Sequence, residues 1–269
     1  MKLFLKYILK KLGLLNRIRK FRFKRQYRTL INRFKGESEY IVNFDGIESK
    51  FSLTDPFSAA FFASHFKNDI YEKDGLKALL AHVNENSIVF DVGSNIGYFT
   101  CFSGKYCSRG RVYAFELGRE NVSILRRNLE LNSLANVVVE HCAVSDLSGS
   151  VFVQDSAVGN AVLKIMNDKV KHEDYVAVRA ITLDEYCDSN KVVPEFIKID
   201  VEGAEMKVLT GMNKLIKGSV KLLIEIHEKE LPQFNSSKEE VLSFLRENQF
   251  SIQIIGNEEK KNLLVLAVK

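Results

Sequence analysis

The sequence predicts an α/β protein with a doubly wound, mostly parallel sheet of seven strands, preceded by an N-terminal extension of helices and a hairpin. Short apolar runs alternate with helical segments from Ser87 onward, and such repeats are typical of a parallel sheet covered on both faces. A glycine-rich loop follows the first of these runs. The 269 residues, 46% hydrophobic and 27% charged, suffice for one such domain and an appendage.

The elements of the sheet domain follow from periodicity. Strands are expected at 88–90, 111–115, 137–140, 196–199, 220–226, 250–255 and 263–268, with the last two antiparallel. Helices are expected at 98–106, 119–132, 204–216 and 237–248, and a β-rich insertion at 149–182. Ligands of such sheets bind at the carboxyl ends of the strands, so the candidate site residues should follow strands.

The segment before the sheet has its own signals. Asp45-Gly46 stands between two alternating runs in residues 37–53 and predicts a hairpin. Asp55-Pro56 can open a helix, and a second helix is expected at 71–82. We therefore expect three parts: a basic amphipathic arm at 1–36, an extension at 37–86 and the sheet domain at 87–269.

The charge is unevenly distributed. Residues 1–36 hold 13 Lys and Arg and no Asp or Glu, whereas the remaining residues carry a net charge of −8. A nucleic-acid enzyme usually spreads positive charge over its binding face, so nucleic acid is not the favoured partner. The arm combines basic and apolar residues, which suits an anionic membrane surface. Packing against the domain or a partner subunit, or RNA binding, are the alternatives, and the oligomeric state stays open.

Other signals exclude several classes of protein. The four cysteines have no C-x-x-C spacing, so we expect buried thiols in a reducing compartment and no structural zinc site. No stretch is long and apolar enough for a transmembrane helix, and no signal peptide is expected. We therefore expect a cytoplasmic protein, with the inner membrane face as a peripheral site.

The sharpest signal is the loop that begins at Asp91 and reads DVGSNIG. Gly93 and Gly97 allow close approach of a ligand, but the spacing is not that of a dinucleotide loop and the phosphate-loop Lys-Ser/Thr is missing. Glu116 ends the next strand, where a carboxylate can accept hydrogen bonds from both ribose hydroxyls. A ligand with a ribose, no phosphate and a cationic centre fits, and S-adenosylmethionine has these features. The alternative is a tight turn with a capping Asp91 and a solvated Glu116.

The chain resembles a known family at several motifs. Ile88–Thr100, IVFDVGSNIGYFT, is similar to the first motif of class I S-adenosylmethionine-dependent methyltransferases, which have a Rossmann-like fold. Phe196–Met212, FIKIDVEGAEMKVLTGM, and Leu223–His227, LIEIH, resemble the FkbM-type family within that class. Ala143–Asp146 and Thr182–Tyr186 also fit the family, so the resemblance covers roughly residues 70–230.

The resemblance implies which residues bind the cofactor S-adenosylmethionine. The implied contacts are Asp91, Gly93, Asn95, Gly97, Glu116 on the ribose, Ala143 or Val144 beside the adenine, and Asp200. Leu117 and Gly118 depart from the family, which commonly has a proline there. The departure puts the conformation after the second strand in question but not the carboxylate of Glu116.

Candidate catalytic residues stand at the ends of the fourth and fifth strands. They are Asp200, Glu202, Glu225 and His227. Members of each pair are two residues apart and share a face of an extended strand. A base is useful when a hydroxyl is methylated. The alternatives are that Glu202 caps the following helix, that His227 is structural, or that the cluster binds a divalent cation; we expect no metal.

Two motifs that are missing from the sequence narrow the choice of methyl acceptor. No Asn-Pro-Pro-aromatic loop of amino methyltransferases follows the fourth strand, and no cysteine follows a proline as in carbon-5 pyrimidine enzymes. We therefore expect O-methylation of a small molecule, and the resemblance implies hydroxyls of sugars, glycans or other secondary metabolites. The alternatives are an RNA methyltransferase that uses the arm as a phosphate anchor and a non-catalytic, membrane-associated S-adenosylmethionine-binding protein.

Overall fold

The computed structural model describes residues 32–66, 70–154, 175–256 and 262–269. The chain divides into two compact units, which are described separately: Met1–Ile41 with Phe51–Tyr71, and Val42–Lys50 with Glu72–Lys269. Residues 1–31, and with them most of the basic arm, lie outside the described part. The expected domain boundaries therefore stay predictions.

The first unit is organised around aromatic side chains. Helix α3 (Pro56–His65) begins after Asp55, whose Oδ1 accepts hydrogen bonds from the backbone N–H groups of Phe57 at 2.7 Å and Ser58 at 3.4 Å. The ring of Phe62 is fully buried, and the rings of Tyr40, Phe51 and Phe66 lie around it with centroid distances of 4.8, 5.0 and 5.1 Å. This unit also contains η1 (Asn32–Phe34).

The expected hairpin is confirmed. Strands β1 (Glu39–Phe44) and β2 (Ile47–Ser52) form a two-stranded sheet. The connecting Asp45 and Gly46 have φ of 52° and 81°, and a two-residue hairpin turn of the favoured type requires positive φ at both positions.

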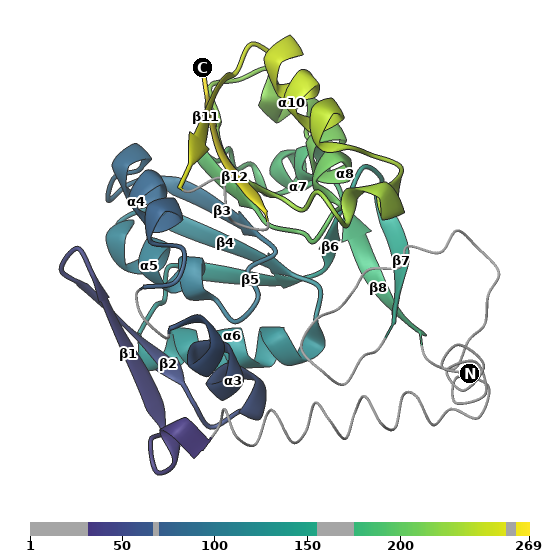
Figure 1. Ribbon diagram of the computed structural model, residues 1–269. Coiled ribbons are helices and arrows are strands. Elements are labelled where there is room, and N and C mark those ends of the chain that lie inside the picture. The colour runs from purple at the N-terminus through teal and green to yellow at the C-terminus, as the bar shows by residue number, and fades with distance from the viewer. Residues whose placement is uncertain (1–31, 67–69, 155–174, 257–261) are drawn as a thin grey trace, which may run out of the picture. The chain divides into compact units, whose positions relative to one another are not determined.

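The second unit contains a seven-stranded sheet in the order β11-β12-β10-β9-β3-β4-β5 (Figure 1). The strands are β3 (Ile88–Val92), β4 (Arg111–Glu116), β5 (Val137–His141), β9 (Phe196–Ile199), β10 (Lys221–Ile226), β11 (Ser251–Ile255) and β12 (Leu263–Val268). The five strands from β10 to β5 are parallel, whereas β12 runs antiparallel to both β10 and β11. The predicted α/β class and its antiparallel closing pair are confirmed.

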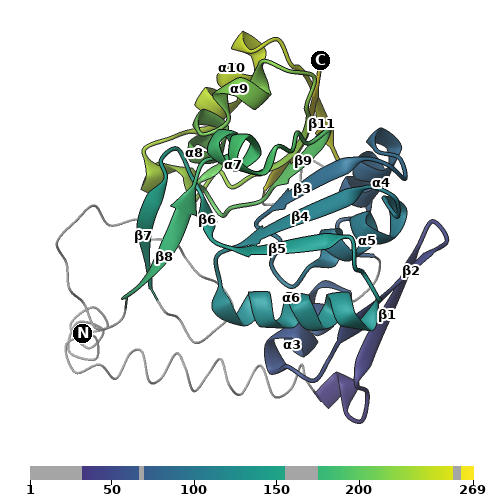
Figure 2. The same cartoon turned by 180° about the vertical axis from the view of Figure 1, so that it is seen from behind.

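Helices cover both faces of this sheet. Figures 1 and 2 show α4 (Lys73–His82), α5 (Tyr98–Tyr106) and α6 (Arg119–Leu131) on one face, and α7 (Leu183–Asn190), α8 (Glu205–Thr210) and α10 (Lys238–Glu247) on the other. Alternate residues of each strand therefore meet different helices. Ile197 and Ile199 belong to the buried cluster with Leu209 and Leu245, while Lys198 between them lies over the ring of Phe99 in α5.

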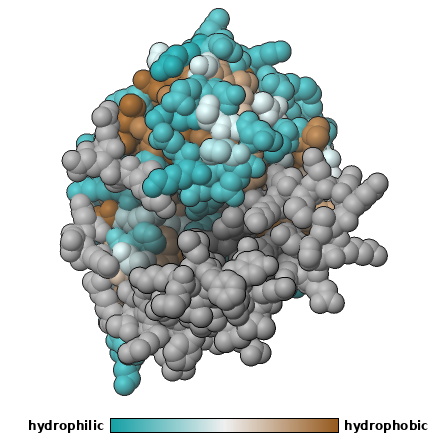
Figure 3. All heavy atoms as spheres, turned by 45° about the vertical axis from the view of Figure 1, so that its right-hand side comes forward, coloured by the Kyte–Doolittle hydropathy of each residue, from teal (hydrophilic) through white to brown (hydrophobic). Residues whose placement is uncertain are grey.

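A small sheet follows β5. It has the order β6-β8-β7, with β6 (Ala143–Val144), β7 (Gly149–Gln154) and β8 (Tyr175–Ile181). Its β7–β8 pair confirms a β-rich insertion near 149–182, of which residues 155–174 lie outside the described part. On the side that Figure 3 shows, the described surface is mainly hydrophilic, with small separate hydrophobic patches.

The single helix expected at 204–216 is wrong. The chain forms α8 and a separate α9 (Asn213–Ile216), with a break at Gly211 and Met212. A Cβ on Gly211 would lie 2.1 Å from the carbonyl oxygen of Ser145, so the chain passes that carbonyl too closely for a side chain. The carboxylate of Asp184 then accepts hydrogen bonds from the N–H groups of Lys214 and Leu215, which starts α9 separately.

Two further findings concern membranes and disulfides. Among the described residues, none of the helices combines the length and apolarity that crossing a bilayer requires. All four cysteines are buried free thiols, as the sequence predicts.

Candidate functional site

The loop between β3 and α5 folds back on itself through three left-handed residues. Gly93, Asn95 and Gly97 have φ of 79°, 51° and 86°. The N–H groups of Gly93 and Ser94 both donate to the carbonyl oxygen of Phe115, at 3.0 and 3.1 Å. A Cβ on Gly97 would lie 2.2 Å from Cδ1 of Leu125. The loop is thus tied to the end of β4 and packed against α6.

Glu116 joins the loop to the end of β4. Its Oε2 accepts from the N–H of Asn95 at 2.7 Å, and its Oε1 accepts from the N–H of Gly118 at 2.6 Å and from Nδ2 of Asn121 at 3.2 Å. Burial raises the pKa of this carboxyl, and the three hydrogen bonds oppose the rise. Gly118 stands where the family commonly has a proline, and its N–H fixes the carboxylate that the sequence predicts to bind a ribose.

Asp91 lies beneath the loop. Its side chain is buried, and its Oδ2 accepts a hydrogen bond from Oγ1 of Thr100 at 2.5 Å. Its Oδ1 accepts no hydrogen bond from the described residues and lies 3.8 Å from Nζ of Lys198. Burial raises the pKa of Asp91, and the nearby Lys198 cation only partly offsets that rise. Direct contact of Asp91 with a ligand stays a prediction.

Lys198 is a buried cation that sequence reasoning missed. Its Nζ lies 3.0 Å from Oδ2 of Asp200 and 4.8 Å from the centroid of the Phe99 ring. Burial alone would lower its pKa, but the carboxylates of Asp200, Asp91 and Glu72 outweigh burial and raise it. The signal was a lone charged residue inside the apolar run FIKI, because a charge buried in a strand needs a partner.

Three predicted carboxylates converge on the imidazole of the fourth predicted residue, His227. Nε2 of His227 lies 3.7 Å from Oδ1 of Asp200, 3.6 Å from Oε2 of Glu202 and 3.8 Å from Oε1 of Glu225. His227 directly follows β10, and Asp200 directly follows the neighbouring β9. The carboxyl ends of two parallel strands therefore bring the cluster together, as their spacing predicts.

The cluster holds a proton on His227. Burial would lower the pKa of the imidazole, but its hydrogen bond to Glu205 and the carboxylates of Asp200, Glu202 and Glu225 raise it to about 10. Burial also raises the pKa of Glu202 and of Glu225. At neutral pH the ligand-free cluster is therefore an imidazolium surrounded by carboxyl groups.

Glu205 is the second residue that sequence reasoning missed. It is fully buried, and its Oε1 accepts hydrogen bonds from Nδ1 of His227 at 2.7 Å and from the N–H of Gly203 at 3.0 Å. Glu202 and Gly203 form the preceding turn with φ of 51° and 105°. The alternative that Glu202 caps the helix has no support, because α8 has Ala204 as its N-cap and no side-chain capping bond.

Ala143 and Val144 form the short strand β6. Both are buried, and they pair with Ala180 and Ile181 of β8. The N–H of the preceding Cys142 donates to the carbonyl oxygen of Glu116 at 3.0 Å. The strand therefore starts beside the end of β4, and its contact with an adenine stays a prediction.

The alternative of a divalent cation rests on the same cluster. Ligand atoms of Asp200, Glu202 and His227 lie within 4.8 Å of one another. A protonated imidazole has no lone pair to offer a metal, and the pKa of His227 is raised to about 10. A cation bound by His227 would therefore have to displace that proton. Ligand atoms of Glu72, Asp200 and Glu225 form a second group within 4.8 Å of one another, and the expected absence of a metal stays a prediction.

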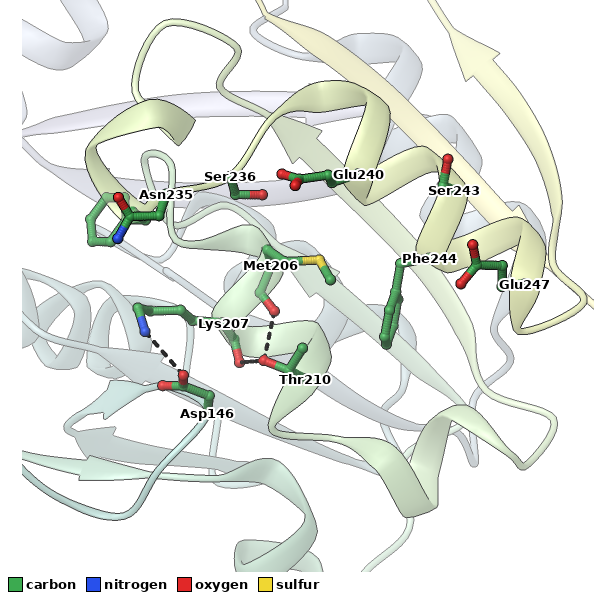
Figure 4. Close-up of a pocket in the computed structure, with 11 residues that line it drawn as sticks. Asp146, Met206, Lys207, Thr210, Asn235, Ser236, Glu240, Ser243, Phe244 and Glu247 are labelled. Carbon is green, nitrogen blue, oxygen red and sulfur yellow. Dashed lines mark hydrogen bonds and ion pairs between the residues drawn. The ribbon is translucent and has the colours of Figure 1, made fainter.

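A separate pocket of about 460 Å³ lies on the outer side of α8, facing α10 and the turn after η2 (Leu231–Phe234) (Figure 4). Met206 and Phe244 supply apolar walls, and the ion pair of Lys207 with Asp146, at 3.0 Å, lies at one side. None of the predicted site residues lines this pocket.

Comparisons with known proteins find a matching family and similar sequences. A family model described as "Methyltransferase FkbM domain" matches residues 91–252. The hexuronic acid methyltransferase AglP of Haloferax volcanii is 31% identical over 159 residues, which are 58% of this chain and 62% of that protein. Methyltransferase 1 of Beauveria bassiana is 28% identical over 152 residues, which are 48% of this chain and 59% of that protein.

The matches thus span about three fifths of the length of these two relatives. Among solved structures, M. jannaschii TYW2 in complex with AdoMet has a TM-score of 0.44 and 17% sequence identity, covering 86% of this chain and 84% of that chain.

Proposed function

The chain belongs to the methyltransferase FkbM domain family, and from this premise we propose that it transfers a methyl group from S-adenosylmethionine to a hydroxyl of a sugar, a glycan or another secondary metabolite. One observation carries the proposal: Asp200, Glu202 and Glu225 surround the imidazole of His227 at the ends of adjacent strands. The glycine loop lies at the same sheet edge, because Gly93 packs directly against the carbonyl of Asp200.

The described residues fit the cofactor. Glu116 accepts from Asn95, Gly118 and Asn121, which fills Oε1 and leaves Oε2 able to accept one more hydrogen bond, enough for one ribose hydroxyl. The side-chain oxygen of Asn95 is buried without a hydrogen-bond partner among the described residues. S-adenosylmethionine, when bound, supplies an activated methyl group; we assign its ribose to Glu116, its adenine to Ala143 and Val144, and its cationic end to the Asp200 side.

The chemistry of the acceptor follows from the cluster. A hydroxyl is a weak acid, and its attack on a methyl carbon is helped by a group that removes its proton. Carboxylates of Asp200 and Glu202 can receive that proton. The side chain of Glu202 is 57% exposed, and partial desolvation together with the neighbouring carboxylates raises its pKa above the ordinary value, which favours proton uptake. The family's relative AglP, named a hexuronic acid methyltransferase, supports a sugar as acceptor.

The basic arm suggests where the acceptor is met. Residues 1–36 carry 13 basic side chains and no acidic one, interleaved with apolar residues. We propose that the arm binds an anionic membrane surface, which would concentrate lipid-linked or membrane-assembled glycans near the site.

The experiment uses the full chain with S-adenosylmethionine and a panel of methyl glycosides, including glucuronides. Formation of S-adenosylhomocysteine and an O-methyl proton signal in the product is the expected outcome. The matched controls are Asp200→Asn, which should lose turnover, and Glu228→Gln, a neighbouring carboxylate whose side chain is 57% exposed and pairs with Lys238. Cofactor binding without methyl transfer to any hydroxyl compound would contradict the proposal.

A further inference from the structure

Glu205 has the contacts of a residue that acts through a neighbour. It lies at the start of α8, is fully buried, and uses one oxygen, Oε1, for both of its hydrogen bonds. Its other oxygen, Oε2, accepts no hydrogen bond from the described residues. Burying a carboxylate with one oxygen that accepts no hydrogen bond lowers the stability of the fold unless a cation lies beside it. His227 supplies that cation, with Nδ1 2.7 Å from Oε1 of Glu205.

The two hydrogen bonds link two separate elements. The bond to Gly203 holds the turn that carries Glu202, and the bond to Nδ1 holds the imidazole that follows β10. The turn holds Glu202 at a φ of 51°, in the left-handed region that favours glycine. One carboxylate thus fixes Glu202 and His227 relative to each other.

The contact at Nδ1 decides which nitrogen is available for chemistry. A carboxylate is an acceptor, so it keeps a proton on Nδ1 in both the charged and the neutral imidazole. The proton that can leave is then the one on Nε2. That nitrogen faces Asp200, Glu202 and Glu225 at 3.6–3.8 Å, which are the groups of the proposed acceptor side.

We propose that Glu205 is a positioning residue: it locks His227 in the Nδ1–H tautomer, so that Nε2 exchanges protons with the carboxylates at the ends of β9 and β10. Glu205 itself touches neither cofactor nor acceptor in this assignment. The inference rests on the proposed function for its kinetic consequence only, because the tautomer is a property of the protein without ligands.

The test is nuclear magnetic resonance of the full chain labelled with ¹⁵N and ¹³C in histidine, without ligand. The charged groups that face His227 are Glu205 from α8, Asp200 and Glu202 after β9, and Glu225 from β10. Lys198 lies behind Asp200, and the charge of Glu230 acts on Glu202. Three variants separate their effects. Glu205→Gln keeps the shape and an acceptor oxygen, Glu205→Ala removes both, and Glu225→Gln removes a carboxylate that makes no bond to Nδ1.

The expected results differ among the variants. Both Glu205 variants should lower the pKa of His227 by about one to two units, the worth of a hydrogen bond to a charged group. The neutral imidazole should stay Nδ1–H in the wild type, in Glu225→Gln and largely in Glu205→Gln, but populate both tautomers in Glu205→Ala. If the pKa and the tautomer of His227 are unchanged in both Glu205 variants, the inference is overturned. If Glu205→Ala does not fold, the pKa of His227 in folded Glu205→Gln is the test.

Kinetics give a second readout. Glu205→Ala should lower kcat about 10²-fold or more, while the KM for the acceptor and the cofactor affinity change little, and Glu205→Gln should recover part of that loss. Equal loss in KM and in cofactor affinity would point to a merely structural role and overturn the inference. If the wild type methylates nothing yet the tautomer shifts as described, the proposed function fails and the positioning role stands.

Discussion

The carbonyl oxygen of Asp200 occupies the space in which a side chain on Gly93 would begin: an ideal Cβ there would lie 1.8 Å from it. The N–H of Asp200 in turn donates to the carbonyl of Val92 at 2.9 Å. The glycine loop and the first residue of the acidic cluster are therefore in direct backbone contact.

This contact predicts that Gly93→Ala strongly lowers the free energy of unfolding. Gly46→Ala is the matched control, because Gly46 has a similar φ of 81° but a Cβ added there would meet no atom within 4 Å. The control should cost about 1–2 kcal/mol from backbone strain alone. Gly93→Ala should cost clearly more in the free energy of unfolding, measured by denaturant titration, and should lose cofactor affinity. Equal costs for the two variants would mean that the loop relaxes away from β9.

Glu116 should control cofactor affinity and its pH dependence. Glu116→Ala should weaken S-adenosylmethionine roughly ten- to a hundredfold by calorimetry, since a hydrogen bond to a charged group contributes about 1.5–3 kcal/mol. Glu120→Ala, an exposed carboxylate in the first turn of α6, is the control. Unchanged affinity in Glu116→Ala would refute the ribose assignment.

The sign of the pH effect follows from the same residue. Burial raises the pKa of Glu116 above its ordinary 4.5 in the ligand-free protein, and the hydrogen-bond-accepting carboxylate is the form that binds. Protons therefore compete with the cofactor, and affinity should fall as the pH decreases through that raised pKa. Glu116→Gln should lack this dependence; an identical pH profile would assign the titration to another group.

The proton acceptor can be identified by comparing Asp200→Asn, Glu202→Gln and His227→Ala with one acceptor. Loss of the true base should lower turnover about 10²–10⁴-fold with little change in cofactor affinity. Near-normal turnover in all three would place the base elsewhere. If only His227→Ala keeps normal turnover, the carboxylates remove the proton and His227 is a structural residue at a strand end.

Lys198 should matter for stability. Lys198→Met removes the cation beside the buried Asp91 and one of the two cations beside Asp200, and breaking a buried ion pair typically costs about 3–5 kcal/mol. Because burial raises the pKa of Asp91 above its ordinary 3.8, the folded state binds its proton more tightly than the unfolded state. The deficit should therefore shrink as the pH falls toward that pKa. Stability is measured by denaturant unfolding. The control is Lys221→Met on β10, which removes a cation that donates to the carbonyl of His82. Equal losses of unfolding free energy in the two variants would show that the carboxylates beside Lys198 do not contribute.

The basic arm makes a separate prediction from composition. The full chain should sediment with vesicles that contain anionic lipid at about 0.15 M salt and not with neutral phosphatidylcholine vesicles. Removal of residues 1–34 should abolish sedimentation and leave cofactor binding intact. If the full chain stays in the supernatant, the membrane proposal is wrong, and packing against the domain or a partner subunit takes its place.

The sequence predicts the sheet, the hairpin and the convergence of Asp200, Glu202, Glu225 and His227, because these follow from local periodicity and from the rule that parallel strands end at one edge. The separation of α8 from α9 was not predictable in this way. It depends on the contact of Gly211 with Ser145, a residue more than sixty positions away.

The missed residues have different causes. Lys198 was visible as a single charge in an apolar strand, and asking for its partner would have led to Asp91 and Asp200. Glu205 carries no such mark, since an acidic residue near the start of a helix is ordinary. Its importance arises from burial and from the direction of Nδ1 of His227, which only three-dimensional coordinates provide.

The order of the sheet has a consequence for synthesis on the ribosome. Val89 of β3 meets Val112 of β4 on one edge but Phe196 of β9 on the other. At about 5–20 residues per second, the 84 residues between these two partners take roughly 4–17 seconds to emerge. During that time the apolar β3 offers an open edge, which is the feature that lets nascent chains stick to one another. The acidic cluster is completed only after residue 227 emerges, so a shorter nascent chain carries the glycine loop without a complete acidic cluster.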